Sequence, residues 1–156
     1  AGTILIDPPS HIIQTNNKSP NIIRKHRIHT SKHELMKRFK TIPEQPKHNP
    51  ILHDYIAQNS IEKLSDGWRW QFDPNFFNRL VIDTPYTQAK LQKPCHIIYG
   101  QNSIVTTDYT ISNLQKQYPS ISSEQIKNAW HAIMLDQPIE LLNAITKKAK
   151  KWTNIN

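Results

Sequence analysis

The chain has 156 residues, of which 37% are hydrophobic and 8% aromatic, and its formal net charge is +8. This length is enough for one folded unit with a hydrophobic core, and the apolar content is low but within the globular range, so we do not expect a disordered tail. No apolar run reaches membrane-spanning length, and no charged-then-apolar signal segment opens the sequence. We therefore expect a globular protein in the cytoplasm, with no membrane partner.

The basic residues gather in two places, within residues 18–47 and in a cluster of four lysines within 147–151. The second group occupies the last turns of a predicted helix, where cations complement the helix dipole. Neither group is accompanied by zinc-ligand spacing, a Gly-rich phosphate loop or an aromatic-basic sheet signature. We therefore interpret both groups as solvated and expect no nucleic-acid partner.

The chain opens with an apolar, β-branched run over residues 3–6, which predicts a buried parallel strand. Asp7 follows, and then Pro8 and Pro9, which exclude a helix and direct the Asp7 carboxylate outward at the strand's carboxyl end. That end is where α/β folds place their chemistry. A buried strand needs neighbours, yet only residues 95–99 and a weaker segment near 124–128 look like further strands. Part of the sheet is therefore expected to lie outside this chain.

Residues 10–65 differ in composition, since they are polar, basic and rich in proline and histidine. They contain two predicted helices, over 31–39 with Ser31 or Thr30 at the N-cap, and over 49–61 with Asn49 at the N-cap and Pro50 in the first turn. The histidines lack tight ligand spacing supported by cysteine or carboxylates, so we expect no metal. We expect residues 10–79 to form a helical cap insertion, and residues 1–9 and 80–156 to form the core.

Residues 66–74 read as a turn followed by alternating aromatic and polar residues. Trp68, Trp70 and Phe72 would share one face of an extended segment. They could pack the cap against the sheet or line a substrate pocket, and packing is the favoured interpretation.

The remaining elements lead to one histidine. We expect a connecting segment over 80–91 with a helix from Pro85, a strand over 95–99 and a helix over 107–118. Cys95, the single cysteine, lies in that strand and is interpreted as a core thiol in a reducing compartment. His131 stands on a loop before an amphipathic helix that begins at Pro138. There an imidazole can face a cleft as a general base.

The order of these segments resembles the carboxyl-terminal half of an α/β-hydrolase. The resemblance covers nearly the whole chain: the strand ending in Leu5-Ile6-Asp7-Pro8-Pro9, the insertion, and the segments 67–74, 94–100 and 131–138. It implies an α/β fold, made of the carboxyl-terminal portion of an α/β-hydrolase sheet with a helical cap insertion. It also implies a serine hydrolase in which nucleophile, acid and histidine follow in that order.

The resemblance implies that His131 is the catalytic histidine, the alternative being a loop histidine that caps the next helix. Many members carry the acid in a Gly-x-x-Asp loop after the strand equivalent to 95–99, but here that position holds Ser103. Others carry it one strand earlier, which corresponds to Asp7. The alternative for Asp7 is a simple turn residue. Asp108 is the fallback acid.

Two further expectations concern the surroundings of the site. Asp136 is expected to fix the loop beside His131 and not to act as its partner. The side chains expected to line an acyl pocket come from the insertion: Trp68, Trp70, Leu52 and Tyr55.

The sequence also departs from the family pattern. Its only glycines are Gly2, Gly67 and Gly100, so no Gly-x-Ser-x-Gly nucleophile elbow can be formed, and the oxyanion loop would precede that elbow. The chain would then be a fragment, a subunit that pairs with a chain carrying the first half, or a truncated homologue. We expect it to be inactive alone.

The activity implied for the assembled protein is hydrolysis of a carboxylic ester or related acyl compound, without a cofactor. Carbon–carbon bond cleavage of a diketone also occurs in this family. The alternative from another class is a non-catalytic binding or interaction protein, in which the cap surface and the basic charge recruit a partner.

Overall fold

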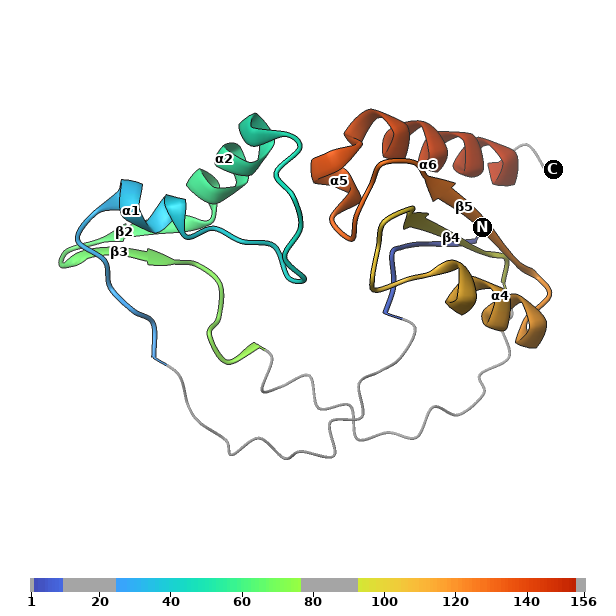
Figure 1. Cartoon of the computed structure of the whole chain (residues 1–156), viewed down its shortest axis with the longest axis horizontal. Helices are drawn as coiled ribbons and strands as arrows, with labels where there is room; N and C mark the ends of the chain where they lie inside the picture. The colour runs from blue at the N-terminus through green and yellow to red at the C-terminus, as the bar shows by residue number, and fades with distance from the viewer. Residues whose placement is uncertain (1, 10–24, 77–92, 154–156) are drawn as a thin grey trace. The chain divides into compact units, whose positions relative to one another are not determined.

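The computed structural model describes residues 2–9, 25–76 and 93–153 (Figure 1). They divide into two compact units. Residues 2–9, 41–48 and 93–153 form unit 1, and residues 25–40 and 49–76 form unit 2. The segment Thr41–His48 lies within the range expected to form the cap but belongs to unit 1. The helix expected from Pro85 lies outside the described residues.

Unit 1 is built on a parallel sheet with the strand order β1-β4-β5. The strands are β1 (Thr3–Ile6), β4 (Cys95–Gly100) and β5 (Ile121–Ile126). In the register, Thr3 lies opposite Cys95, and Cys95 lies opposite Ile121. The expected parallel α/β architecture and the predicted strand over 95–99 are therefore confirmed.

The third strand begins and ends earlier than the segment expected near 124–128. Its interior is polar, and these side chains have partners within the unit. The Ser122 hydroxyl lies 2.9 Å from His96 Nδ1, and the Gln115 amide donates to Ser123 Oγ at 3.3 Å. Such pairing satisfies the polar groups of a half-buried strand, so the strand does not need an apolar interior. The hydrophobic pattern therefore predicted the bounds of β5 incorrectly.

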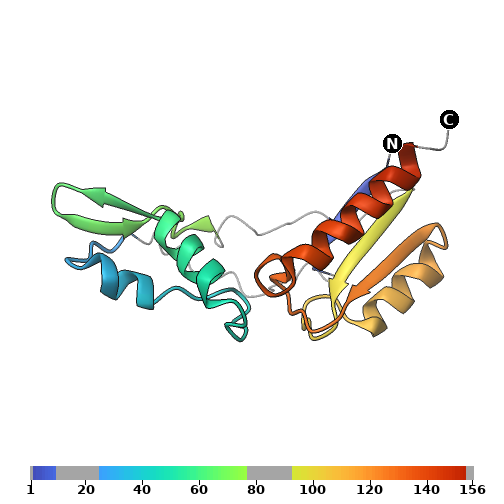
Figure 2. The same cartoon turned by 90° about the horizontal axis from the view of Figure 1, so that it is seen from above.

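Two helices cover opposite faces of the sheet (Figures 1 and 2). On one face Cys95, Ile97 and Tyr99 pack with Ile111 of α4 (Asp108–Gln117). On the other face a second cluster involves α6 (Pro138–Thr153) and α5 (Ile133–Asp136), and its buried members are Ile98, Ile126, Ala129, Ile133, Leu141 and Ala144. Successive residues of β4 thus serve opposite faces, and the whole strand is buried.

The expectation that the first strand is buried is wrong for the described part of the chain. Leu5 and Ile6 are each 38% exposed. β1 pairs with β4 on one side, and no described strand pairs with its other edge. A parallel strand becomes buried only when neighbours cover both sides, and among the described residues β1 has one.

Unit 2 combines the two predicted helices with a hairpin. α1 (Lys32–Lys37) begins after Ser31, whose hydroxyl accepts the Glu34 N–H at 3.3 Å, and α2 (Pro50–Asn59) begins after Asn49, whose side chain accepts the Leu52 N–H at 3.1 Å. Both helices are confirmed, with the N-caps predicted for them.

The hairpin joins β2 (Ile61–Leu64) to β3 (Gly67–Trp70) in antiparallel pairing, so the insertion is not purely helical. Gly67 has φ 149°, and a Cβ there would lie 2.6 Å from the His29 carbonyl oxygen, so only glycine fits. The strand part of the alternating aromatic segment is confirmed over Trp68 and Trp70. The Trp70 ring packs on Phe39 at 6.0 Å between centroids.

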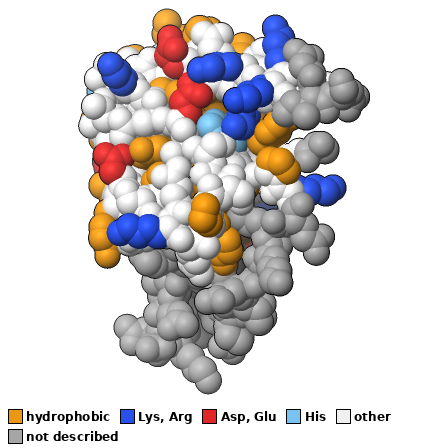
Figure 3. All heavy atoms as spheres, turned by 90° about the vertical axis from the view of Figure 1, so that its right-hand side faces the viewer, with side chains coloured by type: hydrophobic (Ala, Val, Ile, Leu, Met, Phe, Trp, Pro, Cys, Tyr) orange, Lys and Arg blue, Asp and Glu red, His pale blue; other side chains and the backbone are white. Residues whose placement is uncertain are grey.

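The basic end of α6 lies on the surface of unit 1. In Figure 3, Lys and Arg side chains gather with acidic side chains among them. Lys147 Nζ lies 4.0 Å from the Glu124 carboxylate, and Lys148 donates to Ser122 Oγ at 2.8 Å. These contacts agree with a solvated basic face. Among the described residues, no helix has the length and apolarity needed to cross a bilayer.

Candidate active site

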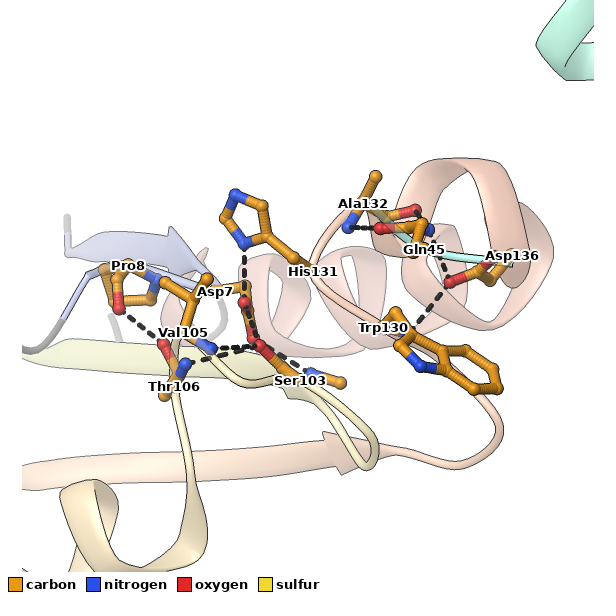
Figure 4. A network of polar contacts seen from close by, with 11 residues as sticks. Asp7, Pro8, Gln45, Ser103, Val105, Thr106, Trp130, His131, Ala132 and Asp136 are labelled. Carbon is orange, nitrogen blue, oxygen red and sulfur yellow. Dashed lines mark hydrogen bonds and ion pairs between the residues drawn. The ribbon is translucent and has the colours of Figure 1, made fainter. Parts of the chain in front are cut away.

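Asp7 is a buried carboxylate at the end of β1, with 1% of its surface exposed. Its Oδ1 accepts the Gly100 N–H at 3.1 Å, and its Oδ2 accepts the Ser103 hydroxyl at 2.5 Å. His131 Nδ1 lies 2.7 Å from the same Oδ2 (Figure 4). Burial of a charge is costly unless hydrogen bonds compensate it, and here three groups do so.

The chain turns at Asp7 in a way that its residue type allows. Asp7 has φ 42°, in the left-handed region, which Asp tolerates better than most other residues. Its N–H still donates to the Ile98 carbonyl at 2.7 Å, as a continuation of the β1-β4 pairing. Thr106 Oγ1 then donates to the Pro8 carbonyl. The carboxylate is thus held at the carboxyl end of the sheet, where the sequence placed it.

His131 lies on the loop between β5 and α5, and its side chain is 31% exposed. One ring nitrogen, Nδ1, faces Asp7, and the other, Nε2, lies on the side of the ring that faces away from Asp7 (Figure 4). None of the described residues hydrogen-bonds to Nε2. A carboxylate at Nδ1 favours the tautomer that carries its proton there and leaves the Nε2 lone pair free. The structure therefore brings together the two residues that the sequence singled out, in a geometry suited to proton transfer at Nε2.

Ser103, which stands where many members of the resembling family carry the acid, hydrogen-bonds to Asp7. Its hydroxyl donates to Asp7 and accepts the N–H groups of Val105 at 3.0 Å and Thr106 at 3.3 Å. It is 7% exposed and lies on the Asp7 side of the imidazole. The sequence did not predict this hydrogen bond to Asp7, although the Gly-x-x-Ser spacing identifies the loop as one that lies near the site.

Asp108, the fallback acid, is engaged elsewhere. Its Oδ1 accepts the Tyr99 hydroxyl at 2.7 Å and the Gln125 amide at 2.9 Å. Burial, together with the hydrogen bond to Asp108, raises the pKa of Tyr99 to about 12. The structure does not bring Asp108 to His131.

Asp136 lies where a loop-fixing residue was expected. Its side chain is buried, and its Oδ2 accepts the Trp130 N–H at 2.8 Å and the Gln45 amide at 2.9 Å. His48 Nδ1 lies 3.3 Å from Oδ1, and the His48 ring stacks on Trp130 with centroids 4.4 Å apart. Asp136 therefore ties the residue before His131 to the segment Thr41–His48.

Gln45 has no counterpart in the sequence predictions. It is 8% exposed, its Oε1 accepts the Ala132 N–H at 2.8 Å, and its Nε2 lies 3.5 Å from the Ala132 carbonyl oxygen. A glutamine between Thr41 and His48, in a proline-containing stretch, is typical of an exposed loop. No local signal could have marked it.

The residues proposed to line a pocket all lie in unit 2. Trp68 carries the ammonium groups of Lys32 and Lys63 over its ring, 5.4 and 5.9 Å from the centroid. Trp70 packs inside the unit, Leu52 is half-buried and Tyr55 is 65% exposed. The Trp70 contact with Phe39 lies within unit 2, so the expected packing of the cap against the sheet stays a prediction. A role in substrate binding stays a prediction for all of these residues.

The sequence matches no protein-family model and no curated protein. Several solved structures share its fold. A thioesterase domain from the curacin biosynthetic pathway is similar with a TM-score of 0.67 and 16% identity, over 92% of this chain and 56% of that one. A novel esterase from Mycobacterium tuberculosis is similar with a TM-score of 0.67 and 17% identity, over 96% of this chain and 52% of that one.

A third similar structure is an alpha/beta hydrolase from Novosphingobium aromaticivorans, with a TM-score of 0.54 and 13% identity, over 94% of this chain and 55% of that one. The chain thus spans about half the length of each of the three structures. Identities this low establish likeness of fold alone. The fold of this chain is therefore a portion of the α/β-hydrolase fold.

Proposed function

We propose that this chain supplies the general base and the acid of a serine-type α/β-hydrolase that cleaves a carboxylic ester or a related acyl compound. One observation carries the proposal: His131 Nδ1 lies 2.7 Å from the fully buried Asp7 carboxylate, while the His131 side chain is 31% exposed and no described residue hydrogen-bonds to its Nε2. Such a pair orients the imidazole and stabilises the imidazolium that forms when Nε2 takes a proton. Esterase and thioesterase structures of the same fold support the acyl substrate class.

The roles follow from this geometry. As a serine oxygen bonds to the acyl carbon, its proton passes to His131 Nε2, and Asp7 balances the positive charge on the ring. His131 then returns the proton to the leaving oxygen as the ester bond breaks. Water attacks the acyl-enzyme in the same way, with His131 as base and then as acid.

We infer that the nucleophile comes from polypeptide outside this sequence. Ser103 already donates its hydroxyl hydrogen to Asp7, on the Nδ1 side of the ring. Cys95 is buried within β4, and burial raises the pKa of its thiol. With three glycines, the 156 residues hold no Gly-x-Ser-x-Gly elbow. The exposed Leu5 and Ile6 of β1 offer a surface on which the rest of the sheet could pack.

The test begins with the codons upstream of Ala1. If the reading frame extends through a Gly-x-Ser-x-Gly motif, or a second chain carries it, the assembled protein should hydrolyse a nitrophenyl ester and bind a fluorophosphonate probe at that serine. His131→Gln should abolish both. The purified 156-residue chain should do neither.

Two results would contradict the proposal. Measurable ester turnover by the 156-residue chain would show that the nucleophile lies inside it. A natural start codon beside Ala1, with no partner chain that carries the motif, would favour a non-catalytic binding protein.

A further inference from the structure

The backbone on both sides of His131 is held by a pair of buried side chains. Gln45 Oε1 accepts the Ala132 N–H at 2.8 Å, directly after the histidine. Gln45 Nε2 donates to Asp136 Oδ2 at 2.9 Å, and the same oxygen accepts the Trp130 N–H at 2.8 Å, directly before the histidine (Figure 4). One linked pair thus fixes both neighbours of the candidate base.

These contacts constrain the histidine itself. The Ala132 N–H belongs to the peptide unit that contains the His131 carbonyl group, so a hydrogen bond to it limits rotation of the His131 backbone. Gln45 is 8% exposed and the Asp136 side chain is fully buried, so water cannot readily replace either partner. The imidazole starts from this backbone, and its Nδ1 must lie within hydrogen-bond distance of Asp7.

Gln45 is itself held by its surroundings. Its N–H donates to Thr41 Oγ1 at 3.2 Å, within the segment Thr41–His48. At the other end of this segment the His48 ring stacks on Trp130 and contacts Asp136. Two residues of this segment, Gln45 and His48, therefore contact the loop that carries His131.

We propose that Gln45 is a positioning residue for His131, which acts through Ala132 and Asp136 to keep Nδ1 in register with Asp7. The proposal rests on the base role proposed for His131. It assigns a function to the segment Thr41–His48. This segment belongs to unit 1, although the residues before and after it in the sequence belong to unit 2.

The first test needs no catalysis. In the 156-residue chain, NMR should show an imidazole N–H signal from His131, shifted downfield by Asp7 and identified by its loss in His131→Gln. Gln45→Met keeps the length of the side chain but removes its hydrogen bonds, so this proton should exchange with solvent about ten-fold faster, as the loss of a buried hydrogen bond implies. Gln115→Met is the matched control, because it removes amide contacts of 3.3 Å to Ile121 and Ser123 away from the histidine.

A second variant disrupts the contact to Asp136 by charge. Gln45→Glu keeps an acceptor for the Ala132 N–H but places a carboxylate beside that of Asp136, so the His131 proton should again exchange faster than in wild type. Circular dichroism identifies the variants that are folded. A folded Gln45→Met with the wild-type His131 signal and exchange rate would overturn the proposal.

The second test uses the assembled hydrolase. Gln45→Met should lower kcat by about 10²-fold with KM nearly unchanged, since a shift of the base by about 1 Å costs that much. Gln115→Met should change neither constant. An assembly without hydrolase activity would refute the proposed function but not the NMR result, so the two failures are distinguishable.

Discussion

Ser103 donates a 2.5 Å hydrogen bond to Asp7, across 96 positions of the chain. The loop after β4 therefore holds the carboxylate that follows β1, which is the acid in the proposed function. The Gly100 N–H from the same loop bonds the other carboxylate oxygen at 3.1 Å. The loop after β4 thus holds Asp7, and His131 approaches it from the loop after β5, so the fold itself sets the orientation of the Asp7 side chain.

The acid role of Asp7 can be tested by Asp7→Asn in the assembled hydrolase. The amide would donate to His131 Nδ1, which places the imidazole proton on Nε2, where it cannot accept one from serine. Turnover should fall by roughly 10⁴-fold. Asp108→Asn serves as control, because Asp108 bonds Tyr99 and Gln125 and not the histidine. Activity near wild type in Asp7→Asn would move the acid role to another residue.

Ser103→Ala should lower the free energy of unfolding of unit 1 and have a smaller effect on the turnover of the assembled hydrolase. The change leaves Asp7 Oδ2 without one donor and removes the Ser103 acceptor of the buried Thr106 N–H. A buried group left unpaired costs about 1–3 kcal/mol, to be measured by urea unfolding. Ser112→Ala, a change at an exposed position of α4, is the control. Equal unfolding free energies for the two variants would show that the Ser103 network adds nothing to stability.

The parts of the fold and of the site that were predictable are those with a local signal. Asp7 was marked by the prolines that follow it, and Ser31 and Asn49 were marked as caps by the residue types around them. Gln45 was not predictable, since its partner Ala132 lies 87 positions away and neither residue has a distinctive neighbourhood. Residues that only the fold topology brings into contact give no signal in the hydrophobic periodicity of the sequence or in the spacing of its motifs.

His96 should make the stability of unit 1 depend on pH. It is buried on the α6 face of β4, 2.9 Å from Ser122 Oγ, and burial lowers its pKa below the ordinary 6.5, with Lys148 and Lys147 adding to the effect and Glu124 opposing it. As pH falls below about 6.5, the unfolded chain binds this proton before the folded chain does. Stability should therefore be present above that pH and be lost as the pH falls toward the folded-state pKa.

The His96 effect is measured by urea unfolding at a series of pH values between neutral and mildly acidic. His96→Gln removes the titrating group, so the free energy of unfolding of this variant should fall less on acidification than that of wild type. His33→Gln is the control, since His33 lies on the exposed surface of α1. Parallel pH profiles for wild type and His96→Gln would contradict this account.

Tyr99 should ionise far later than an ordinary tyrosine. It is 8% exposed on β4, and burial, followed by its hydrogen bond to the Asp108 carboxylate, raises its pKa from 10.0 to about 12. Because the folded state holds this proton more tightly than the unfolded state, Tyr99 contributes stability that is present below pH 10 and lost as pH rises through about 12. Absorbance at the tyrosinate band follows the titration. Tyr99→Phe should remove the late phase of this titration, whereas Tyr109→Phe, a change at an exposed position, should leave that phase in place. A late phase that persists in Tyr99→Phe would contradict this account.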